Sequence, residues 1–185
     1  MIITLPNILT FARIGMLPFL VLCFFIEHTL AHWTALGLFI VASITDYLDG
    51  YLARTLNQYS DLGKVLDPIA DKLLVTIALV MLVAEQTIAG IHVCAVVLIL
   101  SREIYISGLR EYLSDKDVQL PVSYAAKWKT ALQMISITTL LISFALSAHN
   151  SPVLNVGLIL LWLASGLTLY TAYTYTQSAL RQKRS

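Results

Sequence analysis

The stretch TDYLDGYLARTLNQYSDLGKVLDPIADK, residues 45–72, is the part of this chain that most constrains its fold. It holds five aspartates, in a chain of which only 12% of the residues are charged. Apolar runs flank it on both sides, LGLFIVASI at 36–44 and LLVTIALVMLV at 73–83. A carboxylate at membrane depth costs about 2.5–3.5 kcal/mol, so this placement needs a physical reason.

The composition indicates a membrane protein. The chain has 185 residues, 58% of them hydrophobic, and its mean hydropathy is +0.78. A water-soluble domain of this length does not need so much apolar surface. The net charge is +1 and no basic arm stands apart, so we expect no nucleic-acid partner. Cys23 and Cys94 lie in apolar runs, which argues against a disulfide or zinc site.

Apolar segments separated by short polar breaks predict an all-α integral membrane protein with six transmembrane helices, because about 20 apolar residues cross a bilayer. We expect residues 1–185 to form one domain, and the first apolar segment, which lacks a cleavage pattern, to be retained. Ser151 and Pro152 resemble a helix cap and a first helical position. The predicted spans are 6–27, 31–55, 65–85, 88–111, 126–148 and 152–176.

The basic residues predict the orientation of the bundle. Lys and Arg occur at the second and fourth connections and at the C-terminus, but not in the first, third or fifth connection. The positive-inside rule therefore predicts that both termini are cytoplasmic. The four histidines would then lie on the outer side: His28, His32, His92 and His149.

Four of the aspartates have helical spacing. Asp46 and Asp49 are three apart near the end of the second span, and Asp67 and Asp71 are four apart near the start of the third. Because these two spans are antiparallel neighbours, the four carboxylates are expected to converge. Such clustered hard oxygen ligands suit Mg²⁺ or Mn²⁺, plausibly as a pair of ions.

Neighbouring residues refine this interpretation. Pro68 favours a helix start just before Asp67, and Asp61 is expected in the turn before it as a capping or solvated residue. Small side chains at Gly50 and Ala53 leave backbone accessible to a ligand. The fork of Arg54 suits a diphosphate. Phosphoryl chemistry on a nucleotide diphosphate at the cytoplasmic membrane surface is therefore predicted.

The spacing Asp46-x₂-Asp49-Gly50-x₂-Ala53-Arg54-x₈-Gly63-x₃-Asp67-x₃-Asp71 resembles the full signature of the CDP-alcohol phosphotransferases. The resemblance implies a six-helix membrane fold, usually homodimeric, with two divalent metals held by the four aspartates. It implies that CDP contacts the signature's two glycines, its alanine and its arginine. It also implies that Asp71 is the general base.

Other segments are similar to the bacterial branch of that family whose members make phosphatidylglycerol phosphate. They are LPNILTFARIGMLPF, SREIYISGLREYL and KWKTALQM, so the likeness covers about residues 4–134 and fades across the sixth span. Resemblance to this branch implies that the donor is CDP-diacylglycerol and the acceptor is glycerol 3-phosphate. It also implies that the protein lies in a bacterial inner membrane, in contact with membrane lipids. A direct displacement is expected because neither the histidines nor the cysteines lie among the aspartates.

An anionic acceptor needs cations. Arg102 and Arg110 are eight residues apart, on nearly one face of the fourth span, and Lys127 opens the fifth. We expect these three to bind the acceptor phosphate, with Lys129 as a weaker candidate. The alternative is that they meet anionic lipid headgroups.

Two questions remain open at the sequence level. Asn7 and Thr10 recur at a spacing of three with Arg13, and we expect them to form the polar edge of an interfacial helix, with a nucleotide pocket as the alternative. For the chain as a whole, another acceptor (inositol phosphate, serine or a lipid alcohol) and a cation-coupled transporter are the rival functions.

Overall fold

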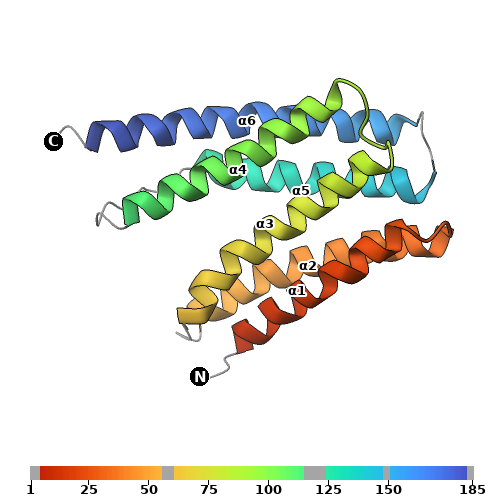
Figure 1. The fold of residues 1–185 in the computed structure, drawn as a ribbon, viewed down its shortest axis with the longest axis horizontal. Coiled ribbons are helices and arrows are strands. Elements are labelled where there is room, and N and C mark those ends of the chain that lie inside the picture. Colours follow the sequence, from red (N-terminus) through yellow and green to blue (C-terminus); the bar gives the residue numbers. More distant parts are fainter. Residues whose placement is uncertain (1–4, 56–60, 115–123, 148–150, 183–185) are drawn as a thin grey trace.

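The computed structural model describes residues 5–55, 61–114, 124–147 and 151–182, and near several helix ends it describes the backbone only. Within these ranges it consists of six α-helices and no strand (Figure 1). The helices are α1 (Leu5–Phe24), α2 (Thr29–Thr55), α3 (Asp61–Ala84), α4 (His92–Ser114), α5 (Tyr124–Ala145) and α6 (Pro152–Gln182). The predicted all-helical class is confirmed.

Successive helices run in opposite directions. The first residues of α1, α3 and α5 lie at the same end of the molecule as the last residues of α2, α4 and α6 (Figure 1). The same end therefore carries Asp46, Asp67 and Asp71, whereas Glu27, Glu85 and the described histidines lie at the other end.

The helices form two groups of three. In one group α1 packs on α2 and both contact α3, while in the other α5 and α4 each pack on α6. The groups meet where α5 contacts α2 and α3, and where α3 contacts α4. Among the described residues, no Cα of α4 comes within 8 Å of a Cα of α5, although the two helices are consecutive. The backbones of α4 and α5 are therefore spaced apart, and each of these helices packs on α6.

The outer surface is apolar. Large hydrophobic side chains point outward along most helices, such as Phe19, Ile104 and Ile159, which are 62%, 75% and 61% exposed. Among the residues that the structure describes, four helices contain a stretch long and apolar enough to cross a membrane: α1, α2, α4 and α6. Exposed apolar surface of this extent is stable in contact with lipid. The described part of the chain is therefore that of a multi-pass membrane protein.

Several helix boundaries differ from the prediction. The third helix begins at Asp61 rather than residue 65, so Asp61 is helical and Asp67 lies in the second turn, with Pro68 inside the helix. Asp61 was expected as a capping or solvated residue of the preceding turn, and it is instead the first residue of α3, a position where an acidic residue is favourable.

Two other helix starts were also misplaced. The second helix starts at Thr29, because the Leu30 N–H donates to His28 Nδ1 (3.2 Å) and the Ala31 N–H to the His28 carbonyl (2.8 Å). The fourth starts only at His92, because Gln86 and Gly90 adopt left-handed conformations in the preceding turn (φ 57° and 58°). The predicted cap of α6 is confirmed: the Leu154 N–H donates to Ser151 Oγ (3.2 Å).

The contact between α5 and α6 is close at Gly157. Ser136 Oγ donates to the Gly157 carbonyl (2.9 Å), and a Cβ on Gly157 would lie 2.8 Å from Leu140 Cδ2 and 3.3 Å from the Leu140 backbone nitrogen. Small residues allow such close approach between membrane helices. This contact fixes α6 against α5 and so helps to fix the residues further along α6.

We expect Gly157→Val to destabilise the protein by about 1–3 kcal/mol, because the added methyls must displace Leu140 or separate the helices. The measurement is the thermal unfolding midpoint in neutral detergent. Gly166→Ala on the same helix is the matched control, since nothing lies within 4 Å of a Cβ there. That control is expected to be neutral or stabilising by up to ~1 kcal/mol. Equal midpoints for the two variants would contradict the close approach.

Candidate active site

Three of the four signature aspartates have described side chains, and they lie close together. Asp46 is on α2, and Asp67 and Asp71 are on α3. The Asp46 carboxylate is near enough to both of the others to repel them electrostatically. Among the described residues, no set of three or more His, Cys, Asp or Glu side chains is arranged to hold a metal. Asp49 lies outside the described side chains, so the convergence of all four stays a prediction.

The first helix supplies partners to two of these carboxylates. Arg13 Nη1 contacts Asp46 Oδ1 at 2.5 Å, and Thr10 Oγ1 donates to Asp67 Oδ1 at 2.6 Å. Thr10 and Arg13 are fully buried and Asn7 is 5% exposed. The expectation that these residues form the polar edge of an interfacial helix is therefore wrong. They form one face of α1 that is turned toward the aspartates.

Arg13 is the residue that the sequence interpretation overlooked as a counter-charge. Clustered carboxylates need positive charge nearby, and the sequence pattern was interpreted as supplying it only through divalent metals. The available signal was the i, i+3, i+6 spacing of Asn7, Thr10 and Arg13 within an apolar helix, because an arginine inside an apolar run needs a partner.

The chemistry of the donor set fits a divalent cation. Carboxylate oxygens from two helices face one another, and among the described side chains Arg13 is the cation bonded to this cluster. Hard oxygen ligands with excess negative charge are those that Mg²⁺ and Mn²⁺ prefer. A metal would relieve repulsion that one arginine does not balance.

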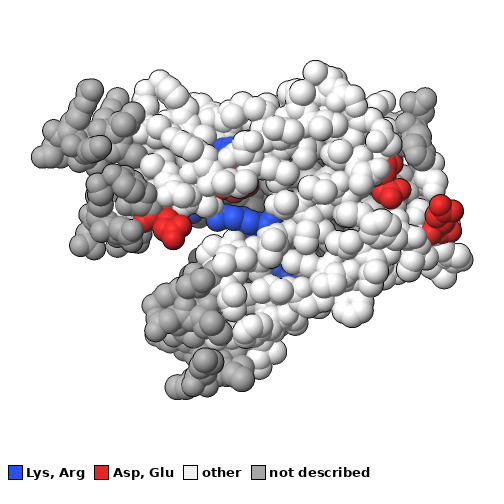
Figure 2. Space-filling model, viewed as in Figure 1, with Lys and Arg blue, Asp and Glu red and all other residues white. Residues whose placement is uncertain are grey.

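A cavity of about 150 Å³ lies beside Asp71, between α3, α4 and α5. Figure 2 shows basic side chains gathered in a hollow at the centre of one face, surrounded mainly by uncharged surface. Its lining residues are Asp71, Lys72, Val75, Arg102, Glu103, Ile106, Arg110, Lys129, Thr130, Gln133 and Met134. A candidate base and three candidate phosphate ligands therefore share one pocket.

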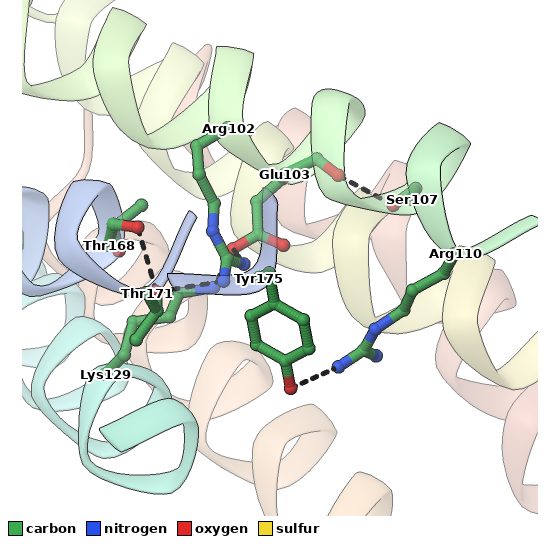
Figure 3. Close-up of polar contacts among 8 residues, drawn as sticks. All are labelled: Arg102, Glu103, Ser107, Arg110, Lys129, Thr168, Thr171 and Tyr175. Carbon is green, nitrogen blue, oxygen red and sulfur yellow. Dashed lines mark hydrogen bonds and ion pairs between the residues drawn. The ribbon is translucent and has the colours of Figure 1, made fainter. Parts of the chain in front are cut away.

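The arginines on α4 face this pocket together, as their spacing of eight predicted. Arg102 is 8% exposed, and its Nη2 donates to Thr171 Oγ1 on α6 at 3.0 Å (Figure 3). Arg110 Nη2 donates to Tyr175 Oη, also on α6, at 3.1 Å (Figure 3). Arg102 is therefore buried beside a cavity, whereas a charge that binds lipid headgroups would lie on the outer surface of the protein.

Lys129, the weaker candidate, lines the pocket together with Lys72 of α3. It is 6% exposed and forms an ion pair with Glu103, whose Oε1 also lies 3.6 Å from Arg102 Nη1. Glu103 therefore joins α4 to α5 across the gap between them. Lys127, which was preferred from the sequence, lies outside the described side chains.

The predicted CDP-binding residues are only partly described. Gly63 is buried in the first turn of α3. The backbone of Gly50, Ala53 and Arg54 continues α2 toward the aspartate end, but their side chains lie outside the description. Their role stays a prediction.

Comparison with known proteins identifies the family. The pattern described as CDP-alcohol phosphatidyltransferase matches residues 3–170, so the chain belongs to the CDP-alcohol phosphatidyltransferase family. The match reaches into α6 and therefore extends beyond the likeness to residues 4–134 that the sequence motifs suggested.

Individual relatives cover nearly the whole chain. A protein of Rickettsia bellii is 45% identical over 174 residues, 92% of each chain. One of Cereibacter sphaeroides is 36% identical over an alignment of 211 positions that covers 96% of each chain. One of Arabidopsis thaliana is 35% identical over 191, covering 97% of this chain and 81% of the relative. The two bacterial proteins are named CDP-diacylglycerol–glycerol-3-phosphate 3-phosphatidyltransferase, and the plant protein carries the same name with the number 2.

Proposed function

We propose that this chain transfers the phosphatidyl group from CDP-diacylglycerol to sn-glycerol 3-phosphate, giving phosphatidylglycerol phosphate and CMP. The observation that carries the proposal is the pocket in which Arg102, Arg110 and Lys129 lie beside Asp71. The Asp71 carboxylate in a pocket also lined by arginines and lysines suits an acceptor that has both a hydroxyl to deprotonate and a phosphate to hold. The names of the relatives support the same reaction.

In this mechanism the acceptor's phosphate binds the two arginines and Lys129 through charge-assisted hydrogen bonds. Its hydroxyl then faces Asp71, which accepts the proton as the hydroxyl oxygen attacks the phosphorus that carries diacylglycerol. A phosphorus–oxygen bond forms to the acceptor, and the bond to CMP breaks. Holding both groups in one pocket makes the attack effectively intramolecular.

A direct displacement needs no nucleophilic side chain. The described histidines and both cysteines belong to the opposite half of the helices: His28, His32, His92, Cys23 and Cys94. A covalent intermediate on any of them would require the phosphatidyl group to cross the bundle.

The residues that would hold the metal are Asp46, Asp49, Asp67 and Asp71. Two Mg²⁺ or Mn²⁺ ions bound there would neutralise the diphosphate of the donor and the charge on departing CMP. On α1, Arg13 holds the Asp46 carboxylate and Thr10 holds the Asp67 carboxylate. These contacts would orient both carboxylates before a metal binds. Gly50, Ala53, Arg54 and Gly63 would contact CDP.

The six helices would all cross a bacterial inner membrane, with both termini and the aspartate end in the cytoplasm. The lysines and arginines at that end support this orientation through the positive-inside rule. The charged residues in the first half of α3 would then lie near the membrane surface, where water and the donor's cytidine are available. A homodimer is the expected assembly, as the family resemblance implies.

The test of this function is to offer the purified protein CDP-diacylglycerol with glycerol 3-phosphate, glycerol, serine or inositol phosphate in separate reactions. We expect CMP release with glycerol 3-phosphate and little with the others, measured by chromatography of the nucleotide. Faster release with another acceptor would overturn the acceptor assignment and leave the reaction class intact. Transport of a solute without CMP release would overturn the assignment of the chain as a phosphotransferase.

Chelation of divalent metals is expected to abolish CMP release, because the carboxylate cluster then faces the donor's diphosphate without compensating charge. Addition of Mg²⁺ or Mn²⁺ in excess of the chelator should restore the rate, whereas an equal ionic strength of Na⁺ should not. Full activity after exhaustive chelation would contradict the role given to the aspartates.

A further inference from the structure

The sixth helix contacts both of the arginines that line the acceptor pocket. Thr171 Oγ1 accepts a hydrogen bond from Arg102 Nη2 at 3.0 Å, and Tyr175 Oη accepts one from Arg110 Nη2 at 3.1 Å. Thr171 is fully buried and Tyr175 is 4% exposed. Neither residue lines the pocket, and both lie beyond the residues that the family pattern matches. Thr171 and Tyr175 therefore contact the two arginines from outside the lining of the pocket.

The hydroxyl of Thr171 is oriented to accept a hydrogen bond from Arg102. It donates its own proton to the Thr168 carbonyl at 2.8 Å, so that its oxygen lone pairs are left for Arg102 (Figure 3). The Arg102 side chain is 7% exposed, and its Nε has no hydrogen-bond partner within the described part of the chain. The Nη2 atom of this guanidinium is thus bonded to α6, while Nε has no partner among the described residues.

Tyr175 makes two kinds of contact with Arg110. Besides the hydrogen bond, the guanidinium carbon lies 5.3 Å from the centroid of the tyrosine ring, within the range of a cation–π interaction. Arg110 is more than a third exposed and has a long side chain, so without such contacts it would sample many rotamers. The buried tyrosine restricts it to those that face the pocket.

We propose that Thr171 and Tyr175 are positioning residues that orient the two guanidinium groups so that both bind a single acceptor phosphate. The inference rests on the proposed function and deepens it by assigning α6 a part in acceptor recognition. Thr171 and Tyr175 are four residues apart and share a helix face, as do Arg102 and Arg110 at eight apart. The contacts of α6 with α4 therefore fix the positions of the two guanidinium groups relative to each other. Preorganised cations bind an anion without the ordering cost that free side chains incur.

The test uses substitutions that keep shape and remove only the contact. Thr171→Val and Tyr175→Phe retain the side-chain volume and, at Tyr175, the ring. Tyr170→Phe on the same helix is the matched control, because Tyr170 is 60% exposed on the outer surface. Each variant is measured with glycerol 3-phosphate and CDP-diacylglycerol varied in turn, together with its thermal unfolding midpoint.

We expect each of the two variants to raise the KM for glycerol 3-phosphate about tenfold, the effect of losing a hydrogen bond to a charged group. The kcat and the KM for CDP-diacylglycerol should stay within about twofold of wild type, because the carboxylates and the donor site are untouched. Residual CMP release with glycerol, which has no phosphate, should not change. Tyr170→Phe should match wild type throughout.

A role in packing alone would give a different pattern. If Tyr175→Phe and Tyr170→Phe behave alike, or if the KM values of both substrates rise together as the unfolding midpoint falls, the inference is overturned.

Calorimetric binding of glycerol 3-phosphate in neutral detergent separates this inference from the proposed function. Wild-type binding without CMP release would overturn the function, and the loss of affinity in the two variants would still support the inference. Equal affinity in wild type and variants would overturn the inference whatever the enzyme catalyses. Absence of binding by the wild-type protein would overturn both.

Discussion

Replacing Asp71 with Asn is expected to lower kcat for CMP release by about 10²–10⁴-fold, the usual contribution of a positioned general base. Of the three signature aspartates whose side chains are described, only Asp71 lines the cavity, and it lies near Asp46. The amide fills the same space but cannot accept the proton of the acceptor hydroxyl. The other signature aspartates remain in this variant, so we expect affinity for CDP-diacylglycerol to change little. The measurements are single-turnover kinetics and equilibrium binding of the donor.

Asp46→Asn is the matched comparison for Asp71→Asn. Asp46 is bonded to Arg13 and does not line the cavity. Its loss should therefore weaken metal and donor binding together, and higher metal concentration should partly restore activity. Near-normal turnover of Asp71→Asn would show that another group accepts the proton.

Arg102→Ala is expected to cost ~2–5 kcal/mol of glycerol 3-phosphate binding, because a buried arginine makes charge-assisted, often bidentate bonds to a phosphate. The expected cost for Arg110→Ala is smaller, since Arg110 is more exposed and water screens its charge. The KM for CDP-diacylglycerol should be nearly unchanged in both variants. Steady-state kinetics in neutral detergent, and again with anionic lipid added, measure these effects.

Two controls accompany Arg102→Ala. Arg102→Lys should restore binding only in part, because an ammonium replaces the charge but not the planar fork. Arg184→Ala removes a basic residue of the C-terminal tail and should cost about 1 kcal/mol or less, in a manner that depends on anionic lipid. If Arg102→Ala and Arg184→Ala behave alike in both conditions, the cations bind lipid headgroups and not the acceptor.

Local sequence signals predicted the parts of the fold that depend on few residues. Ser151 caps α6 as its type and position indicated, because a cap needs only the adjacent turn. Arg102 and Arg110 share a face because helical geometry alone places residues eight apart nearly in line. By contrast, the start of α3 at Asp61 was missed because Pro68 was taken to mark the first turn.

Partners that lie far apart in the sequence could not be predicted in this way. Arg13 and Asp46 are 33 residues apart, Arg102 and Thr171 are 69 apart, and Glu103 and Lys129 are 26 apart across a gap. A periodic pattern identifies which face of a helix is polar, but not which other helix that face meets. The packing of α1 on α2, and of α4 on α6, supplies that information for the first two pairs.

The division of the bundle into two groups of three helices bears on how such a protein can diversify. The carboxylates and their Arg13 partner come from α1, α2 and α3, whereas Arg102, Arg110, Lys129 and the α6 contacts come from α4, α5 and α6. Under the proposed function, most of the groups that would activate the lipid donor lie in the first half of the chain, and most of those that would select the alcohol lie in the second, with Asp71 serving both. If these roles hold, mutations in the second half would change the product while the first half keeps its chemistry. A chimaera that joins α1–α3 of this chain to α4–α6 of a relative with another alcohol should therefore inherit the relative's product.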